Sequence, residues 1–243
     1  MSRWLDSRNG GLAAVLAHPD DESFACAGAL ALAHDAGRVT RLLMATRGEA
    51  GTPDGSADAA LADVREEELR CAAGAIGLDE VTVLEGYPDG GIGDLPFAQL
   101  VDEIAAWLAQ RRPDALITFG AHGVTGNPDH VVVGSAARWA VERLAEAGIA
   151  PHAVYVVAPV FGAGARRYDL SAEEGAATHR IDITAVAARK IQALACHASQ
   201  RDAAAEAAEI RAALDRDGVV HEGYNRVRPI VPAPHPRFDE RLV

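Results

Sequence analysis

The stretch LAAVLAHPDDESF, residues 12–24, decides the fold. Residues 12–17 form a short apolar run, and the polar sequence HPDDE follows it at once, starting at His18. An apolar run of this length predicts a buried strand, and Pro19 cannot continue a strand ladder. Residues 23–36 are rich in Ala and Leu and precede a glycine, which predicts a helix and its end. The stretch therefore predicts a strand, a tight turn and a helix.

Outward from this unit the same alternation repeats. Further strands are predicted at residues 39–46, 81–84, 115–119 and 154–157, and helices at residues 61–76, 97–110 and 129–147. Glycine-rich loops are predicted at residues 49–60, 86–96 and 120–128. Strands separated by helices of this length favour a parallel sheet with right-handed crossovers. We therefore expect an α/β fold with a mostly parallel sheet of about five or more strands and helices on both faces.

The pattern is weaker after residue 160. A short strand is predicted at 181–184, helices at 185–198 and 203–214, and an irregular segment at 226–243, where four prolines occur. A chain of 243 residues suits one domain of this class. We expect a single domain over residues 1–243, with a catalytic core at about 12–200 and a C-terminal extension at 201–243.

Composition excludes several classes of function. The formal net charge of −12 argues against a nucleic-acid or anionic-membrane partner. No apolar run reaches the roughly 18 residues of a membrane span, and the first ten residues lack an apolar signal core. The three cysteines, Cys26, Cys71 and Cys196, form no CxxC pair. This pattern predicts buried thiols in a reducing compartment, without a disulfide framework or a Cys-rich zinc site. The expected location is cytoplasmic.

Polar residues follow two of the predicted strands, where ligands bind in open parallel sheets. His18 and Asp21 follow the first strand, and the sequence NPDH, ending at His130, follows the fourth. Taken alone, each motif could be a helix cap beside an ordinary polar residue. Together, two imidazoles and one carboxylate are the ligand set of a catalytic zinc. The same set also suits Fe(II), so the ligands leave the metal open.

Four blocks now carry a resemblance: AHPDDESF, ATRGEAG, REEELRCAAGAIGL and TGNPDHVVVG, joined by ARKIQALACHASQ at residues 188–200. From about residue 12 to 200 the chain resembles the LmbE-like (PIG-L) family of zinc-dependent de-N-acetylases. The family acts on N-acetylglucosaminyl-phosphatidylinositol, mycothiol and bacillithiol precursors, chito-oligosaccharides and glycopeptide sugars. The resemblance implies a Rossmann-like sheet. It also implies a metal-dependent hydrolase that removes an acetyl group from the amide nitrogen of an N-acetylglucosamine-type sugar or glycoconjugate.

The resemblance also assigns roles. His18, Asp21 and His130 match the metal ligands, for zinc, iron or another divalent ion, and Asp20 matches the general base. Arg65 matches a position that contacts the sugar's polar substituent in some members. The side chains predicted to bind substrate are Arg65, Asp89, His122 and His197. The alternatives are a solvated surface arginine for Arg65 and a buried structural histidine for His197.

Two positions depart from the family pattern. Asn127 stands where the family usually has the first histidine of HPDH, and His122 stands where an acidic residue or Asn is common. In the family that histidine is thought to stabilise the tetrahedral oxyanion. Asn127 therefore becomes the predicted oxyanion donor, with His122 on the same loop as its rival.

The sequence excludes two alternative functions and leaves two others open. A dinucleotide-dependent oxidoreductase would need a glycine cradle in place of HPDDES, and a serine hydrolase would need the G-x-S-x-G elbow, which this sequence lacks. A metal-binding, non-catalytic sugar-binding protein and an amidase acting on thiol-sugar conjugates stay open. The expected partner is a small N-acetylated sugar or glycoconjugate, and a homo-oligomer is compatible with the sequence.

Overall fold

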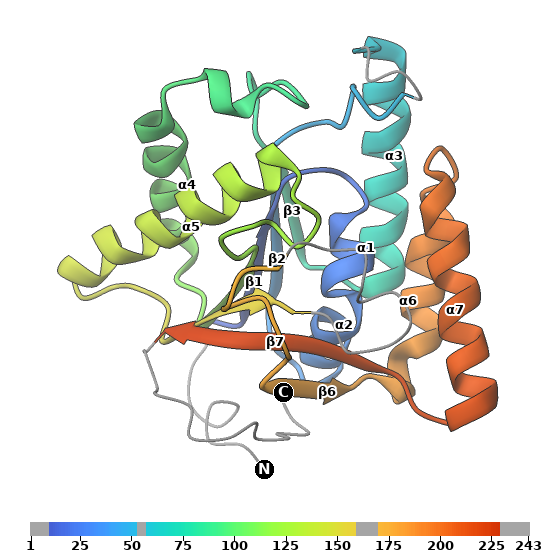
Figure 1. Ribbon diagram of the computed structural model, residues 1–243. Helices are drawn as coiled ribbons and strands as arrows, with labels where there is room; N and C mark the ends of the chain where they lie inside the picture. The colour runs from blue at the N-terminus through green and yellow to red at the C-terminus, as the bar shows by residue number, and fades with distance from the viewer. Residues whose placement is uncertain (1–9, 53–56, 159–169, 229–243) are drawn as a thin grey trace.

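A computed structural model describes residues 10–52, 57–158 and 170–228 of the chain (Figure 1). These residues contain a seven-stranded sheet in the order β3-β2-β1-β4-β5-β7-β6. The strands are β1 (Leu12–Leu16), β2 (Thr40–Met44), β3 (Glu80–Val83), β4 (Ala115–Thr118), β5 (Ala153–Val157), β6 (His179–Asp182) and β7 (His221–Arg228). The first five strands of that order are parallel, and β7 is antiparallel to both of its neighbours. The prediction of a mostly parallel sheet is confirmed.

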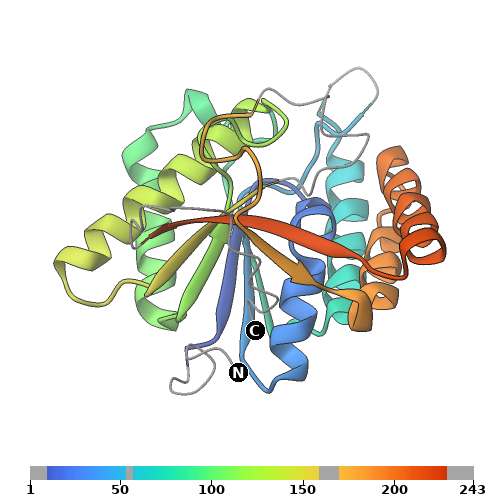
Figure 2. The same cartoon turned by 60° about the horizontal axis from the view of Figure 1, so that its bottom comes forward.

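Helices cover both faces of the sheet, as predicted (Figure 2). One face carries α4 (Phe97–Arg111) and α5 (Pro128–Glu146). The other carries α1 (Asp21–Ala25), α2 (Ala27–Asp35), α3 (Ala59–Ile76) and α6 (Ala187–Cys196), with α7 (Arg201–Asp217) packed outside α6. Short 3₁₀ turns lie at Ile92–Asp94 and Thr184–Val186. In the part of the chain that the structure describes, no helix has the length and apolar character that crossing a membrane requires.

The central strand β1 places the site. All five of its residues are buried, because helices cover both of its faces and leave no solvent side for polar residues. It pairs in parallel with β2 and β4, so the carboxyl ends of these strands meet at one edge of the sheet. The segment that follows β1 and the segment that follows β4 therefore lie next to each other.

The single helix predicted at residues 23–36 is wrong. The helix is interrupted at Cys26, whose φ of −152° is not helical, and a second helix, α2, begins at the next residue. The physical reason is distant in sequence, since Glu222 on β7 accepts the backbone N–H groups of Gly28 and Ala29, both at 2.8 Å. A buried carboxylate thus caps a second helix N-terminus.

The irregular tail predicted from residue 226 is also wrong in part, because residues 226–228 complete β7, and residues 229–243 lie outside the described residues. The segment at 201–228, expected to extend a core ending near 200, supplies this strand to the sheet between β5 and β6. Its sequence, HEGYNRVR, contains no apolar run, so the pattern of strand prediction missed it.

The prediction of three free thiols is wrong for two of them. Cys71 on α3 and Cys196 at the end of α6 form a disulfide, with Cα atoms 5.7 Å apart and a sequence separation of 125. The two helices pack side by side, which brings the thiols together. Only Cys26 is a free buried cysteine, as expected. The cysteine pattern therefore no longer supports a reducing compartment.

Candidate metal centre

Three predicted ligands converge beyond the carboxyl ends of β1 and β4. His18 follows β1, Asp21 opens α1, and His130 lies in the first turn of α5. The Nδ1 atom of His18 lies 3.2 Å from the Nε2 atom of His130. The carboxylate of Asp21 lies 3.2 Å from the same Nε2 and 3.7 Å from the same Nδ1. All three side chains are buried, and their ligand atoms lie within 4.8 Å of one another.

The hydrogen bonds at the far side of each imidazole assign its tautomer. The Nδ1 of His130 lies 3.0 Å from the carbonyl of Gly123, which can only accept, so this nitrogen carries the proton. The Nε2 of His18 lies 3.0 Å from Asp89 and 3.3 Å from Asp129, which are likewise acceptors. In neutral rings, the two nitrogens that face each other therefore both present lone pairs. Such a contact requires a cation, either a proton or a metal ion, between the two nitrogens.

Asp129 is a further member of this cluster, and the sequence interpretation missed it. It was expected only as a helix cap, yet its carboxylate contacts His18 and accepts the backbone N–H groups of Gly90 at 2.7 Å and Ile92 at 3.3 Å. Carboxylates that orient ligating histidines are a regular part of metal sites. Its place immediately before His130 in NPDH was the available signal.

The charges of this cluster call for a cation. Burial lowers the pKa of His18, but Asp129, Asp89 and Asp21 more than offset it and raise the pKa to about 10. For His130 burial also lowers the pKa, and Asp21 reverses the direction so that it is raised. Burial raises the pKa of Asp21, and the two histidines outweigh it and bring the pKa down to about 2. Carboxylates surround the two histidines closely enough to hold positive charge at this position.

These residues fit a divalent metal. The donor set of His18 Nδ1, His130 Nε2 and the Asp21 carboxylate matches the nitrogen and oxygen ligands of catalytic zinc sites, and Fe(II) takes the same set. Each ligand is held from behind: His130 by Gly123 and by stacking of its ring on Phe119 at 4.1 Å, and Asp21 by the N–H of His18 at 2.8 Å. Gly123 has φ +65° and touches the His130 side chain so closely that any Cβ there would collide with it.

Asp20, the predicted base, occupies a strained position beside this cluster. Its φ of 126° is rarely adopted by residues other than glycine and costs about 1–3 kcal/mol. Its carboxylate, 18% exposed, lies 3.1 Å from the guanidinium of Arg65. Burial and the charge of Asp21 raise its pKa to about 7, and Arg65 acts in the opposite direction.

Arg65 is buried, with 3% of its surface exposed, so the alternative of a solvated surface arginine is wrong. Its guanidinium donates to the carbonyls of Pro19 and Gly48. Gly48 has φ +73°, and a Cβ there would come within 2.6 Å of the guanidinium. The glycine in ATRGEAG thus lets this loop close around Arg65. Contact of Arg65 with a substrate stays a prediction.

The remaining predicted substrate-binding residues, and the predicted oxyanion donor Asn127, do not all lie at the cluster. Asp89 contacts His18 and accepts the N–H of Ala50 at 2.9 Å. The side chain of His197 is fully buried, 2.6 Å from Glu22. Asn127 caps α5, where its Oδ1 accepts the N–H of Asp129 at 2.8 Å. His122 is exposed on the loop after β4. The structure thus brings Asp89 into contact with His18 of the cluster, whereas His197 contacts Glu22 of α1.

The similarity of this chain to known proteins agrees with this geometry. Residues 13–141 match the family model of GlcNAc-PI de-N-acetylase, the PIG-L family, and the chain belongs to this family. It is 33% identical to a 1D-myo-inositol 2-acetamido-2-deoxy-alpha-D-glucopyranoside deacetylase from Nakamurella multipartita, over 78% of this chain and 79% of the relative. It is 30% identical to a probable N-acetyl-alpha-D-glucosaminyl L-malate deacetylase 2 from Bacillus cereus, over 79% of this chain and 84% of the relative. Against mycobacterial relatives of the first kind, the chain spans about half of their length, 49%.

Solved structures share the fold. The N,N'-diacetylchitobiose deacetylase from Pyrococcus horikoshii aligns with a TM-score of 0.66 at 21% identity, over 89% of this chain and 83% of that one. GalB, the 4-carboxy-2-hydroxymuconate hydratase from Pseudomonas putida KT2440, aligns with a TM-score of 0.70 at 21% identity, over 93% and 99%. Because a deacetylase and a hydratase both have this fold, the fold alone does not select the reaction.

Proposed function

We propose that this protein is a metal-dependent hydrolase that removes the acetyl group from the amide nitrogen of an N-acetylglucosamine-type sugar or glycoconjugate. His18, Asp21 and His130 would hold one divalent ion, zinc in the first instance. The observation that carries the proposal is the contact of the two histidines, whose facing nitrogens lie 3.2 Å apart beside the Asp21 carboxylate and both present lone pairs when the rings are neutral. When bound, a divalent metal lowers the pKa of water and polarises a carbonyl oxygen.

Asp20 supplies the proton transfer. Its carboxylate follows His18 by two residues, is accessible to water, and is oriented by Arg65 at 3.1 Å. It takes a proton from the attacking water and passes it to the nitrogen of the leaving amine. Arg65 serves this step by holding the carboxylate, whether or not it also reaches the substrate. Asp89 and Asp129 serve it by fixing the ring of His18.

Asn127 is the proposed donor to the developing oxyanion. Its Oδ1 is committed to the cap of α5, so the amide Nδ2 is the end of the side chain that remains to donate. Amide hydrolysis builds negative charge on the carbonyl oxygen, and one well-placed donor contributes about 10²–10³-fold in kcat. Asn127→Ala should show that loss, and His122→Ala should be near neutral. The reverse result would transfer the role to His122.

The relatives favour sugars as substrates. The two compared above are named for substrates in which an acetylated glucosamine carries a polar group, inositol in one and malate in the other. We therefore propose a small glycoside of N-acetylglucosamine with a polar aglycone as the substrate class. An amidase acting on thiol-sugar conjugates is the second member of the same reaction type.

A released-amine assay tests the function. Zinc-loaded protein is incubated with N-acetylglucosamine, its inositol and malate glycosides and N-acetylated thiol-sugar conjugates, beside an Asp20→Asn variant. We expect turnover of a glycoside and a loss of about 10²–10⁴-fold in Asp20→Asn with unchanged metal content. Loss of metal in Asp20→Asn would exchange the roles of Asp20 and Asp21. Binding of the sugars without turnover by the parent would instead support a non-catalytic sugar-binding protein.

A further inference from the structure

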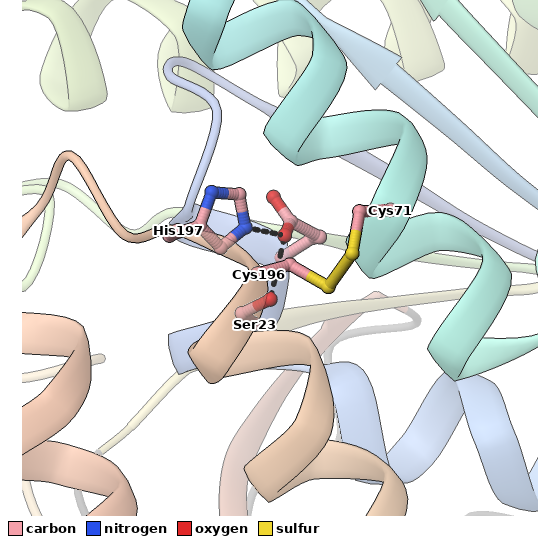
Figure 3. The surroundings of a disulfide bond; sticks show 5 residues. Ser23, Cys71, Cys196 and His197 are labelled. Atoms are coloured by element: carbon pink, nitrogen blue, oxygen red, sulfur yellow. Dashed lines mark hydrogen bonds and ion pairs between the residues drawn. A yellow bond between two sulfur atoms is a disulfide. The ribbon is translucent and has the colours of Figure 1, made fainter.

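A buried polar chain connects the end of α6 to the backbone of Asp20. The Nε2 of His197 lies 2.6 Å from Oε1 of Glu22, and the other carboxylate oxygen of Glu22 accepts the backbone N–H of Asp20 at 3.1 Å. The hydroxyl of Ser23 donates to the same Oε1 at 2.6 Å. His197, Glu22 and Ser23 are all 0–1% exposed. Figure 3 shows His197 and Ser23 directed at this one carboxylate.

These three hydrogen-bonded side chains take no part in the metal centre or in the proposed proton transfer, yet burying them costs free energy. A carboxylate and an imidazole removed from water must be compensated by their mutual contacts. The Nδ1 of His197 is nevertheless buried without a hydrogen-bond partner. Such an uncompensated group calls for an explanation beyond stability.

The explanation lies at Asp20. Its backbone is held at φ 126°, a conformation that persists only when its surroundings enforce it. The N–H of Asp20 is bound by Glu22, and its carboxylate by Arg65. Asp20 is therefore held at its backbone by Glu22 of α1, which His197 contacts in turn, and at its carboxylate by Arg65 of α3.

The two holding elements are themselves cross-linked. Cys196, the residue before His197, forms the disulfide with Cys71 of α3 (Figure 3). Two residues after His197, Ser199 donates through its N–H and its hydroxyl to Glu68 of α3, at 2.8 and 2.7 Å. The segment that carries His197 is thus bound on both sides to the helix that carries Arg65.

We propose that His197 is a positioning residue that acts through Glu22 to hold Asp20 in its strained, reactive orientation, with the Cys71–Cys196 disulfide as its anchor. The proposal rests on the proposed function, because it takes Asp20 as the base. It replaces contact with the substrate as the role of His197, whose side chain is fully buried against Glu22.

The first test is a double-mutant cycle on the zinc-loaded enzyme. His197→Leu should lower kcat by about 10–10²-fold, the cost of misplacing a catalytic group, with KM and metal content unchanged. His197→Gln, whose amide can still donate to Glu22, should recover most of that loss. In an Asp20→Asn background His197→Leu should have no further effect, because the group it positions is already disabled. Asp202→Ala, exposed in the first turn of α7 and outside these contacts, is the control and should retain kcat.

The second test does not need turnover. In the metal-free protein the backbone amide of Asp20 should be strongly protected from hydrogen exchange, and His197→Leu should remove that protection while leaving the amides of β1 protected. Glu22→Gln replaces the acceptor of the Asp20 N–H and serves as a second variant, with the same expected losses of protection and of kcat. Replacing both Cys71 and Cys196 by Ser should give a smaller acceleration at the same amide.

The outcomes separate the two proposals. An Asp20→Asn variant that remains fully active removes the base, and with it both the mechanism proposed above and this role of His197. If Asp20→Asn is impaired and His197→Leu still imposes its full additional loss on the residual turnover, the positioning role alone is overturned. Fast exchange of the Asp20 amide in the unaltered protein overturns it as well.

Discussion

Two charged clusters lie at the two ends of α1, one at its first residue and one at the break between α1 and α2, and they are built differently. In the closed cluster, Glu222 accepts Lys190 Nζ at 2.7 Å, the N–H groups of Gly28 and Ala29 at 2.8 Å, and the Tyr224 hydroxyl at 2.9 Å. The ammonium of Lys190 donates also to the carbonyl of Phe24 at 2.8 Å. One carboxylate thus accepts from four donors, one of which, Lys190, carries the opposite charge.

The open cluster consists of His18, Asp21, Asp89, Asp129 and His130. Here three carboxylates surround two imidazoles whose facing nitrogens lie 3.2 Å apart, a contact that a proton or a metal ion must bridge. Glu222 and Lys190 are buried, and so are all members of the open cluster except the half-buried Asp89, so burial of charge does not distinguish the two clusters. The difference is that the closed cluster is complete within the chain and caps α2, whereas the open cluster could hold a metal ion. We infer that the first serves folding and the second serves chemistry.

Removing the cation of the closed cluster should have the largest effect on stability. Lys190→Met leaves Glu222 buried without its counter-charge, which costs about 3–5 kcal/mol. Urea denaturation of the metal-free protein measures the loss, and titration with zinc should give the parent's affinity, because Lys190 does not touch the open cluster. A Lys190→Met variant of parental stability, or one with altered zinc affinity, would contradict the division of roles.

Supplying the cation of the open cluster should stabilise the protein by less. Zinc at 100 times its Kd should raise the free energy of unfolding by about 2.7 kcal/mol, since only the folded chain presents the site. The gain should vanish in His130→Ala and persist in Lys190→Met, with thermal unfolding in zinc and in chelator as the measurement. A full zinc effect in His130→Ala would show that the ion binds elsewhere.

Replacing Glu174 should have the smallest effect on stability, because Glu174 contacts the loop that holds His130 and not the open cluster itself. Its carboxylate accepts the N–H groups of His122 at 2.9 Å and Val124 at 2.8 Å, and so secures the loop whose Gly123 carbonyl orients His130. Burial raises the pKa of Glu174, but Ser171 and these N–H groups outweigh it and lower the pKa below its ordinary value of 4.5.

A carboxyl group whose pKa is lowered by folding adds stability above its unfolded pKa, and that stability is lost as the pH falls through the folded value. Glu174→Gln should therefore cost about 1 kcal/mol at neutral pH and approach the parent's stability as the pH drops below the ordinary range of a glutamate. Denaturation of both proteins over a pH series measures this. A difference that stays constant with pH would mean that Glu174 acts through its shape and not its charge.

The sequence by itself determined the unit of strand, turn and helix at residues 12–24 and the three residues predicted as metal ligands. An apolar run ending in HPDDE requires a buried strand followed by a turn, and NPDH repeats this after β4. Because parallel neighbouring strands end at one edge, two local signals were enough to bring His18, Asp21 and His130 together. The same locality explains the prediction of β1 through β5 and their intervening helices, whose periodicity is legible over ten to twenty residues.

Only the tertiary structure decided what is held across long separations. Glu222 splits the first helix from 194 residues away, and Cys71 meets Cys196 across 125 residues. His197 reaches Glu22 across 175 residues, which favours the alternative of a buried structural histidine over the predicted substrate contact. Such contacts leave no periodic trace in the chain, because packing of the helices and strands, and not the neighbours in sequence, sets which polar groups must satisfy one another in the interior.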